Sequence, residues 1–147
     1  MIIRKATLDD LNALSMLFDA YRVFYNKSSD LNAAKIFLGD RIKNNESELY
    51  LAETNDSKII GFVQLYPLFS STRLKRLWLL NDLFVAPEYR SQGISVLLID
   101  RAKQLARETN AVAITLETAK LNTIGNALYP KTGFVLDTDH NFYEWET

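Results

Sequence analysis

Six residues at positions 90–95, Arg-Ser-Gln-Gly-Ile-Ser, carry the clearest chemical signal in the chain. They lie between an apolar run that ends at Val85 and an apolar run with helical spacing that follows Gly93. Backbone N–H groups at such a junction can point outward together, and the helix dipole adds partial positive charge. Gly93 permits a close backbone approach, and Arg90 can bind a phosphate oxygen. The segment predicts an anion-binding loop, although a plain strand-to-helix turn would contain the same residues.

The spacing of the glycines excludes two other phosphate-binding loops. A dinucleotide-binding turn needs G-x-G-x-x-G, and a nucleoside-triphosphate loop needs G-x-x-x-x-G-K-[ST]. Neither pattern occurs in the chain. We therefore expect neither hydride transfer nor nucleotide hydrolysis.

The composition excludes further classes of function. The chain has no cysteine and a single histidine, His140, so we expect no disulfide, no cysteine nucleophile and no metal site. The 17 Lys and Arg residues nearly balance the 18 Asp and Glu residues, which argues against nucleic-acid binding. No stretch approaches the roughly 18 apolar residues of a membrane span, and the first ten residues lack an apolar signal segment. We expect a cytoplasmic protein without a membrane partner.

The apolar periodicity predicts an α+β fold: a mixed, mostly antiparallel sheet with helices on both faces. We expect residues 1–147 to form a single domain, because the chain contains no repeat or linker. Helices are expected from about Thr7, over 31–43, over 93–108 and within 122–133. β-rich runs occupy 2–6, 48–54, 58–69, 76–85 and 111–118, and two short strands are expected within 135–146. The second and third runs should form a hairpin, and the fourth and fifth should be parallel.

Two segments together resemble a known family. "LNDLFVAPEYRSQGIS" at 80–95 and "NTIGNALYPKTGF" at 122–134 resemble the GNAT-type N-acetyltransferase superfamily, whose hallmark is Arg/Gln-x-x-Gly-x-Gly/Ala after a strand ending in valine. The resemblance implies the acyl-CoA N-acyltransferase fold. It also implies transfer of acetyl from acetyl-CoA to a primary amine of a small molecule or peptide. We expect direct attack in a ternary complex, because no cysteine exists to carry the acyl group.

The resemblance implies which residues hold acetyl-CoA. Backbone groups of Leu83, Phe84 and Val85 would lie along the pantetheine arm. Asn122 matches an asparagine that holds the cofactor arm in similar enzymes. The residues that match the pyrophosphate loop are Arg90, Ser91, Gln92, Gly93, Ile94 and Ser95. Serine replaces the usual glycine or alanine at the last of these positions, and its small size suits a first helical turn.

Tyr129 matches the tyrosine that protonates the departing thiolate in many similar enzymes. A phenol with an ordinary pKa near 10 can donate to a developing thiolate. Pro130 follows directly and disfavours helical geometry at the preceding residue, so the aim of Tyr129 is left open. A buried aromatic residue with its hydroxyl at the surface is the alternative role.

Asn81 and Asp82 are a polar pair in an otherwise apolar strand, beside the expected acetyl group. The attacking ammonium must lose a proton, and some similar enzymes carry a glutamate where this chain has Asn81, which cannot accept one. Asp82 is the remaining base, directly or through water, but adjacent strand residues face opposite ways unless a bulge intervenes. A carboxylate held by backbone donors or an arginine is the alternative. Backbone N–H groups near Phe84 and Val85 could stabilise the oxyanion.

Acceptor recognition in similar enzymes falls to the first helices and their loop. Tyr21, Phe24 and Tyr25, with Arg22 among them, form an aromatic-rich patch there, which could instead be core or an oligomer contact. Glu117 could meet the amine, or could be an exposed strand end. Similar proteins often pair through their sheets or C-terminal strands, so the resemblance allows a homodimer. The alternative function is a non-catalytic acyl-CoA-binding or sensing module, for which Asn81 is the best argument.

Overall fold

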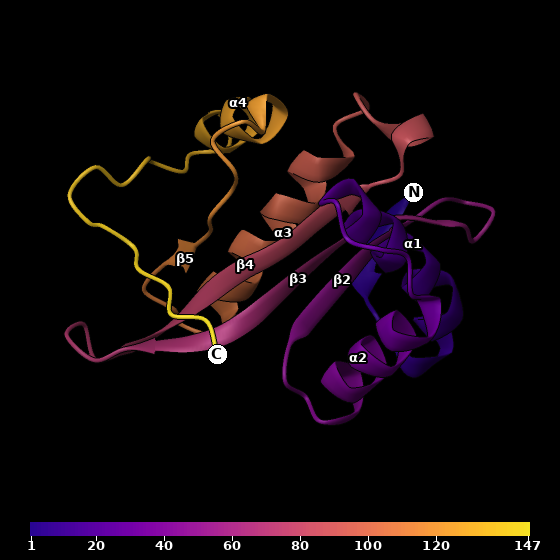
Figure 1. Cartoon of the computed structure of the whole chain (residues 1–147), viewed down its shortest axis with the longest axis horizontal. Coiled ribbons are helices and arrows are strands. Elements are labelled where there is room, and N and C mark those ends of the chain that lie inside the picture. Colours follow the sequence, from indigo (N-terminus) through magenta and orange to yellow (C-terminus); the bar gives the residue numbers. More distant parts are fainter. The chain divides into compact units, whose positions relative to one another are not determined.

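One five-stranded sheet organises the first part of the chain (Figure 1). The computed structural model describes residues 1–147, and the strands lie side by side in chain order. Successive pairs are antiparallel except the last, which is parallel. The strands are β1 Ile2–Lys5, β2 Glu48–Glu53, β3 Ile59–Ser70, β4 Lys75–Val85 and β5 Ile114–Thr115. The predicted sheet, its hairpin and its parallel crossover are confirmed.

Helices lie on both faces of this sheet, as predicted. The helices that cover the sheet are α1 Leu11–Phe24, α2 Leu31–Lys43 and α3 Ile94–Glu108, and short 3₁₀ turns lie at Leu8–Asp10 and Pro87–Tyr89. A fourth helix, α4 Thr123–Lys131, follows the last strand in the chain. Two neighbouring residues of β3 show which helix covers each face of the sheet, because successive side chains of a strand point to opposite faces. Phe62 packs against Phe18 of α1, whereas a Cβ on Gly61 would lie 3.4 Å from Leu98 of α3. None of the helices combines the length and the apolar composition that a membrane span requires.

The chain divides into two compact units, Met1–Leu116 and Glu117–Thr147. The first unit contains the sheet with α1, α2 and α3, and the second contains α4 and the C-terminal segment. Each unit is described by itself below.

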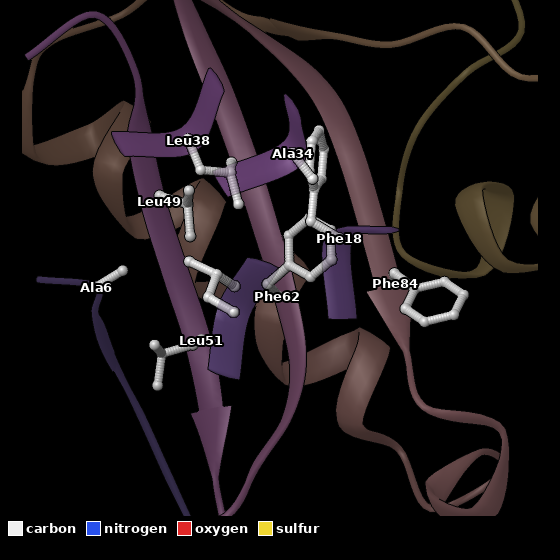
Figure 2. Packing of buried hydrophobic residues seen from close by; sticks show 9 residues of the cluster. Ala6, Phe18, Ala34, Leu38, Leu49, Leu51, Phe62 and Phe84 are labelled. Carbon is white, nitrogen blue, oxygen red and sulfur yellow. The ribbon is translucent and has the colours of Figure 1, made fainter. Parts of the chain in front are cut away.

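The apolar core under α1 and α2 joins both helices to the sheet (Figure 2). The rings of Phe18 and Phe62 meet edge to face with centroids 6.0 Å apart, a favourable aromatic arrangement. The fully buried Leu38 of α2 and Leu51 of β2 extend the same cluster. Since this packing holds α1 against β3 and β4, it also positions the residues discussed below.

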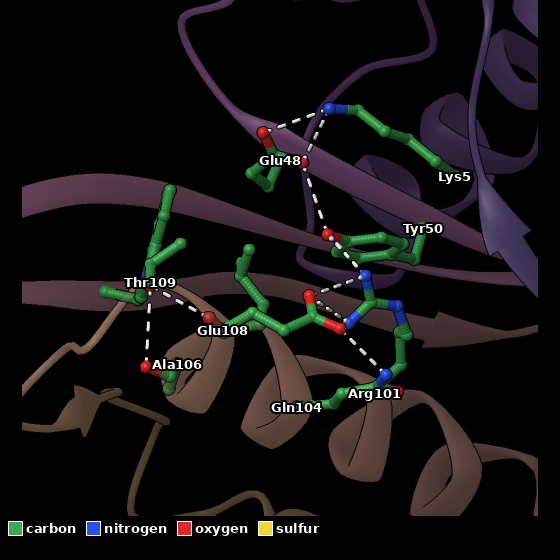
Figure 3. A network of polar contacts seen from close by, with 10 residues as sticks. Lys5, Glu48, Tyr50, Arg101, Gln104, Ala106, Glu108 and Thr109 are labelled. Carbon is green, nitrogen blue, oxygen red and sulfur yellow. Dashed lines mark hydrogen bonds and ion pairs between the residues drawn. The ribbon is translucent and has the colours of Figure 1, made fainter.

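A polar network fastens α3 to the opposite face of the sheet (Figure 3). Arg101 lies over the Tyr50 ring, 4.2 Å from its centroid, and donates to the Tyr50 hydroxyl. That hydroxyl donates to Glu48, which also pairs with Lys5 of β1. Burial raises the pKa of Tyr50 to about 12, so the hydroxyl keeps its proton and remains a donor.

The start of the first helix follows the predicted capping pattern. The Asp10 carboxylate accepts the Thr7 backbone N–H at 2.8 Å, which satisfies a donor that the helix cannot pair. Arg4 of β1 pairs with the same carboxylate at 2.7 Å. A 3₁₀ turn therefore occupies 8–10, and α1 itself begins at Leu11.

The C-terminal end of α4 is a Schellman motif, and Pro130 lies within it. The N–H of Gly133, which has φ +91°, bonds the Pro130 carbonyl, and the N–H of Phe134 bonds the Tyr129 carbonyl. The Tyr129 and Phe134 rings meet edge to face with centroids 5.9 Å apart. Tyr129 thus lies in a regular helical turn, because Pro130 falls where the helix is already ending.

The two short strands predicted within 135–146 are wrong. The structure contains no strand after β5, and Val135, Phe142 and Trp145 are largely exposed. The Asp137 carboxylate accepts the backbone N–H groups of Asp139 and His140, and this local turn competes with extended pairing. Alternating residues alone do not make a strand, because a ladder needs a partner.

Truncation of the central core ring tests this packing. Phe62→Ala should lower the free energy of unfolding by about 3–5 kcal/mol, because a fully buried ring leaves a cavity. Urea unfolding followed by circular dichroism measures the loss. Ile36→Ala, at an exposed site of α2, should change stability by less than about 0.5 kcal/mol. Equal effects of the two substitutions would contradict the assigned core.

Candidate functional site

A β-bulge in β4 reverses the faces that this strand presents. Gln64 of β3 is paired with Asp82, but the next residue, Leu65, is paired with Leu80, so Asn81 is the extra residue. Before the bulge, Trp78 points toward α3 and donates to Thr109 at its end. After the bulge, the strand's alternation is shifted by one residue, and Asp82 takes the face that α1 covers. The bulge that the sequence left open is therefore present.

Asp82 is a buried carboxylate with a defined set of donors. It is 4% exposed, and Gln64, which is fully buried, donates to its Oδ2 at 2.7 Å. Ser47 in turn donates to the Gln64 carbonyl at 2.8 Å, which fixes the orientation of the amide. Asn81 donates to the other carboxylate oxygen at 3.0 Å. Neither an arginine nor a backbone N–H holds the carboxylate. Its partners are instead the side chains of Gln64, Asn81 and Tyr21.

The environment of Asp82 shifts its proton equilibrium. Burial raises the pKa of the Asp82 carboxyl above its ordinary value, because the charged form loses solvation. Hydrogen bonds from Gln64, Tyr21 and Asn81 oppose this shift by favouring the ionised form. A carboxyl with a raised pKa and hydrogen-bonded partners is typical of acid–base sites.

Asp82 lines a pocket of about 470 Å³ between α1, α2 and β4. Four aromatic side chains form much of its wall: Phe18, Tyr21, Tyr25 and Phe37. The Tyr21 hydroxyl also approaches the Asn81 carbonyl at 3.4 Å, which links α1 to the bulge. Arg22 and Lys27 line the same pocket. The pocket thus combines an apolar wall with one buried acid and two cationic side chains.

Of the predicted acceptor residues, Tyr21 and Tyr25 line this pocket and Phe24 does not. The Phe24 ring is half exposed and lies near Phe84, with the Arg90 guanidinium 5.4 Å from its centroid. Glu117 is exposed and belongs to the second unit.

The far end of β4 leaves one edge without a strand partner. β5 pairs only with Trp78 and Leu79, so residues 80–85 face no strand on that side within the first unit. Ala86 donates to Ile60 of β3, and hydrogen-bonding direction alternates along an antiparallel pair. The backbone groups of Leu83 and Val85 therefore point to the open edge, whereas those of Phe84 point to β3. Phe84 contributes a core side chain that is 6% exposed.

The loop at 90–95 has the backbone of an anion site. Ser91 and Gly93 adopt left-handed conformations, with φ +61° and +78°, and no side chain caps the start of α3. The first N–H groups of α3 therefore have no acceptor inside the helix. A Cβ on Gly93 would meet no atom within 4 Å, so its conformation rather than crowding requires glycine.

The remaining residues predicted to bind the cofactor differ in burial and in hydrogen-bond partners. Arg90 donates through Nε to the Val85 carbonyl at 3.0 Å, and its guanidinium carbon lies 5.3 Å from the Phe84 ring centroid. Ile94 is buried as an anchor of α3, while Ser91 and Gln92 are exposed and Ser95 is half-buried. Asn122 is the N-cap of α4: it accepts from Gly125 and donates to Thr118.

Comparison with known proteins decides the family. The model of the acetyltransferase (GNAT) family matches residues 13–134. The chain belongs to this family. It is 43% identical over 143 residues to the uncharacterized N-acetyltransferase YhfO of Bacillus subtilis, covering 97% of this chain and 95% of that protein. It is 34% identical over 132 residues to a probable acetyltransferase of Haemophilus influenzae, and the match covers 86% of this chain and 90% of that protein. The crystal structure of a probable acetyltransferase matches with a TM-score of 0.95 at 40% identity, and the match covers 100% of this chain and 98% of that chain.

Sequence reasoning missed several residues of this GNAT acetyltransferase site. Gln64 and Ser47 gave no signal, because their link to Asp82 depends on strand register. The helical spacing of Phe37 predicts a position in the apolar core, whereas its side chain lines the pocket. The capping role of Asn122 was readable, because asparagine before a helical segment is a common N-cap.

The pairing of Gln64 with Asp82 predicts a titration shift in the acetyltransferase. Gln64→Leu should raise the pKa of Asp82 further, because it removes a hydrogen bond that favours the ionised form. Carboxyl-carbon NMR titration of the folded protein measures this value. Gln92→Leu, at an exposed loop residue, is the control and should leave the Asp82 titration unchanged. A lower Asp82 pKa in Gln64→Leu would refute the assigned role of the amide.

Proposed function

We propose that this acetyltransferase transfers an acetyl group from acetyl-CoA to a primary amine by direct attack in a ternary complex. The observation that carries the proposal is the buried Asp82 carboxylate, which faces an aromatic pocket at the bulge of β4. The open β4 edge and the uncapped loop before α3 belong to the same unit and supply polar backbone groups for an extended phosphorylated thioester. Family membership supports the choice of acetyl-CoA.

The residues at the loop and the strand edge suit different parts of acetyl-CoA. The N–H groups around Gly93 can donate to diphosphate oxygens, aided by the α3 dipole. The outward backbone groups of Leu83 and Val85 can bond the amides of the pantetheine arm as a strand would. The Val85 carbonyl already accepts from Arg90, so Arg90 would release it or share it.

Asp82 acts as the base in this proposal. The acceptor reaches the pocket as an ammonium, and Asp82, directly or through water, takes one proton so that the neutral nitrogen has a lone pair. The nitrogen attacks the thioester carbon, the C–N bond forms and the C–S bond breaks. The nitrogen loses its second proton, and the departing thiolate gains one. The resemblance assigns that last donation to Tyr129.

A non-catalytic acyl-CoA-binding module is the second candidate, favoured by one observation. The bulge residue is Asn81, whose amide donates to Asp82 and cannot itself accept a proton. The buried acid beside it favours the enzyme. Calorimetry with acetyl-CoA and a free-thiol assay with a broad amine panel separate the two, because a module binds the thioester and releases no thiol.

Loss of the base should reduce the reaction more than binding. Asp82→Asn should lower kcat/KM by about 10²-fold or more, the usual contribution of a positioned base, with acetyl-CoA affinity nearly unchanged. A thiol-release assay and calorimetry measure the two quantities. Asp100→Asn, at an exposed position of α3, should match the unaltered protein. Undiminished thiol release in Asp82→Asn would remove this carboxyl from the mechanism.

The pH dependence gives a separate check on Asp82. A base works only when ionised, so kcat/KM should fall as the pH drops through the raised pKa of this carboxyl. Gln64→Leu should move this acid limb to higher pH. A limb that does not move in the variant would assign the titration to another group.

Removal of the Tyr129 hydroxyl tests the proposed thiolate donor. Tyr129→Phe keeps the ring contact with Phe134 and should lower kcat by about 10²-fold. Tyr143→Phe, which alters a 91% exposed tyrosine of the same unit, is the matched control. Unchanged kcat in Tyr129→Phe would show that the thiolate receives its proton elsewhere.

A further inference from the structure

The charges around the acceptor pocket are unequal, and this asymmetry carries information about the acceptor. The only acidic side chain in the lining is Asp82, which is 4% exposed. The lining also contains Arg22 and Lys27, which come from the end of α1 and the segment that follows it. A ligand in this pocket therefore meets negative charge on β4 and positive charge where α1 ends.

The two cationic side chains differ in how far they are already neutralised. Arg22 lies 3.5 Å from the Asp19 carboxylate and donates to the Ser28 carbonyl. Asp19 also accepts from Ser29 at 2.6 Å and from the Asp30 N–H at 2.8 Å, so its charge is shared among several donors. The Lys27 ammonium forms no ion pair within the protein. Among the side chains that line the pocket, Lys27 thus has no ion-pair partner and Arg22 is paired only with Asp19.

The aromatic side chains of the pocket indicate what kind of ligand framework would fit between the charged groups. The rings of Phe18 and Phe37 are stacked 6.0 Å apart at 8°, and those of Tyr21 and Tyr25 meet edge to face at 5.0 Å. Such surfaces bury apolar groups, and their faces also attract an ammonium near Asp82. The lining therefore suits an apolar body that carries one positive and one negative group.

We propose that the acceptor is an amino carboxylate: a primary amine on an apolar body with a carboxylate at its other end. The amine approaches Asp82, and the carboxylate pairs with Lys27 and the free N–H groups of Arg22. A diamine or polyamine would place its second ammonium against these cations, which disfavours it. This inference rests on the acetyl transfer proposed above, because the reacting amine is assigned to the Asp82 end.

Three probes with one body and different end charges test the proposal. They are 4-(aminomethyl)benzoate, benzylamine and 4-(aminomethyl)benzylamine, whose far ends are negative, neutral and positive. With saturating acetyl-CoA, kcat/KM for thiol release should be about five- to tenfold higher for the benzoate than for benzylamine, and lowest for the diamine. Equal values, or a preference for the diamine, would overturn the proposal.

Charge reversal at Lys27 tests whether the pocket lining causes the order of kcat/KM among the three probes. Lys27→Glu should invert the order, so that the diamine exceeds the benzoate, because the far end of the ligand would then meet a carboxylate. Lys35→Glu makes the same change in net charge at an exposed site of α2 outside the lining and should retain the original order. An unchanged order in Lys27→Glu, or an inversion in both variants, would refute the assignment.

Direct binding separates this inference from the proposed function. Ligand-observed NMR gives Kd for the three probes without any reaction. If the benzoate binds best and Lys27→Glu inverts the order while no probe releases thiol, the charge selection stands and the acetyl transfer to this class fails. If thiol is released without charge preference, the proposed function stands and the amino-carboxylate inference fails.

Discussion

One extra residue in β4 determines what the sheet presents to α1. In an unbroken strand, Trp78, Leu80 and Asp82 would share a face, and the carboxylate would point into the apolar contact with α3. Burial of an ionisable group there, without polar partners, would cost several kcal/mol. The bulge at Asn81 moves Asp82 to the face of α1, opposite Gln64. The tolerance of a charge in a central strand therefore depends on this local break in register.

The side-chain amides around Asp82 keep that charge available. Gln64 and Asn81 offer N–H donors, which stabilise a carboxylate without supplying a counter-ion that would suppress its basicity. Ser47 holds the Gln64 amide in the donating orientation. A salt bridge would lower the pKa, and an apolar shell alone would raise it strongly. Around Asp82, burial raises the pKa of the carboxyl and the hydrogen bonds from the neighbouring side chains oppose that rise.

The pocket over Asp82 derives its character from α1 and α2 rather than from the sheet. The sheet supplies the acid and the open edge of β4, both features that suit a common reaction, in keeping with membership of the GNAT acetyltransferases. The helices supply the rings, and Arg22 and Lys27 add positive charge where α1 ends. The buried acid and the pocket wall that faces it therefore come from different elements of the first unit.

The residue pattern determined much of the fold by itself. Helical spacing located α2 at Leu31–Lys43, and the β-rich runs predicted the hairpin and the parallel crossover, because these features follow from local periodicity and turn chemistry. The loop around Gly93 was readable for the same reason, since positive φ and a strand-to-helix junction are local. The roles of Asp82, Asn122 and Tyr129 remain predictions.

Only the tertiary structure decided what depends on partners distant in the sequence. The register that opposes Gln64 to Asp82, the single-residue bulge and the missing C-terminal ladder each require knowledge of the neighbouring strand. The same holds for the pocket, whose lining includes both Lys27 and Asp82 although they are 55 positions apart in the sequence. Local propensity governs the elements of this chain, whereas long-range packing decides which polar groups share one cavity.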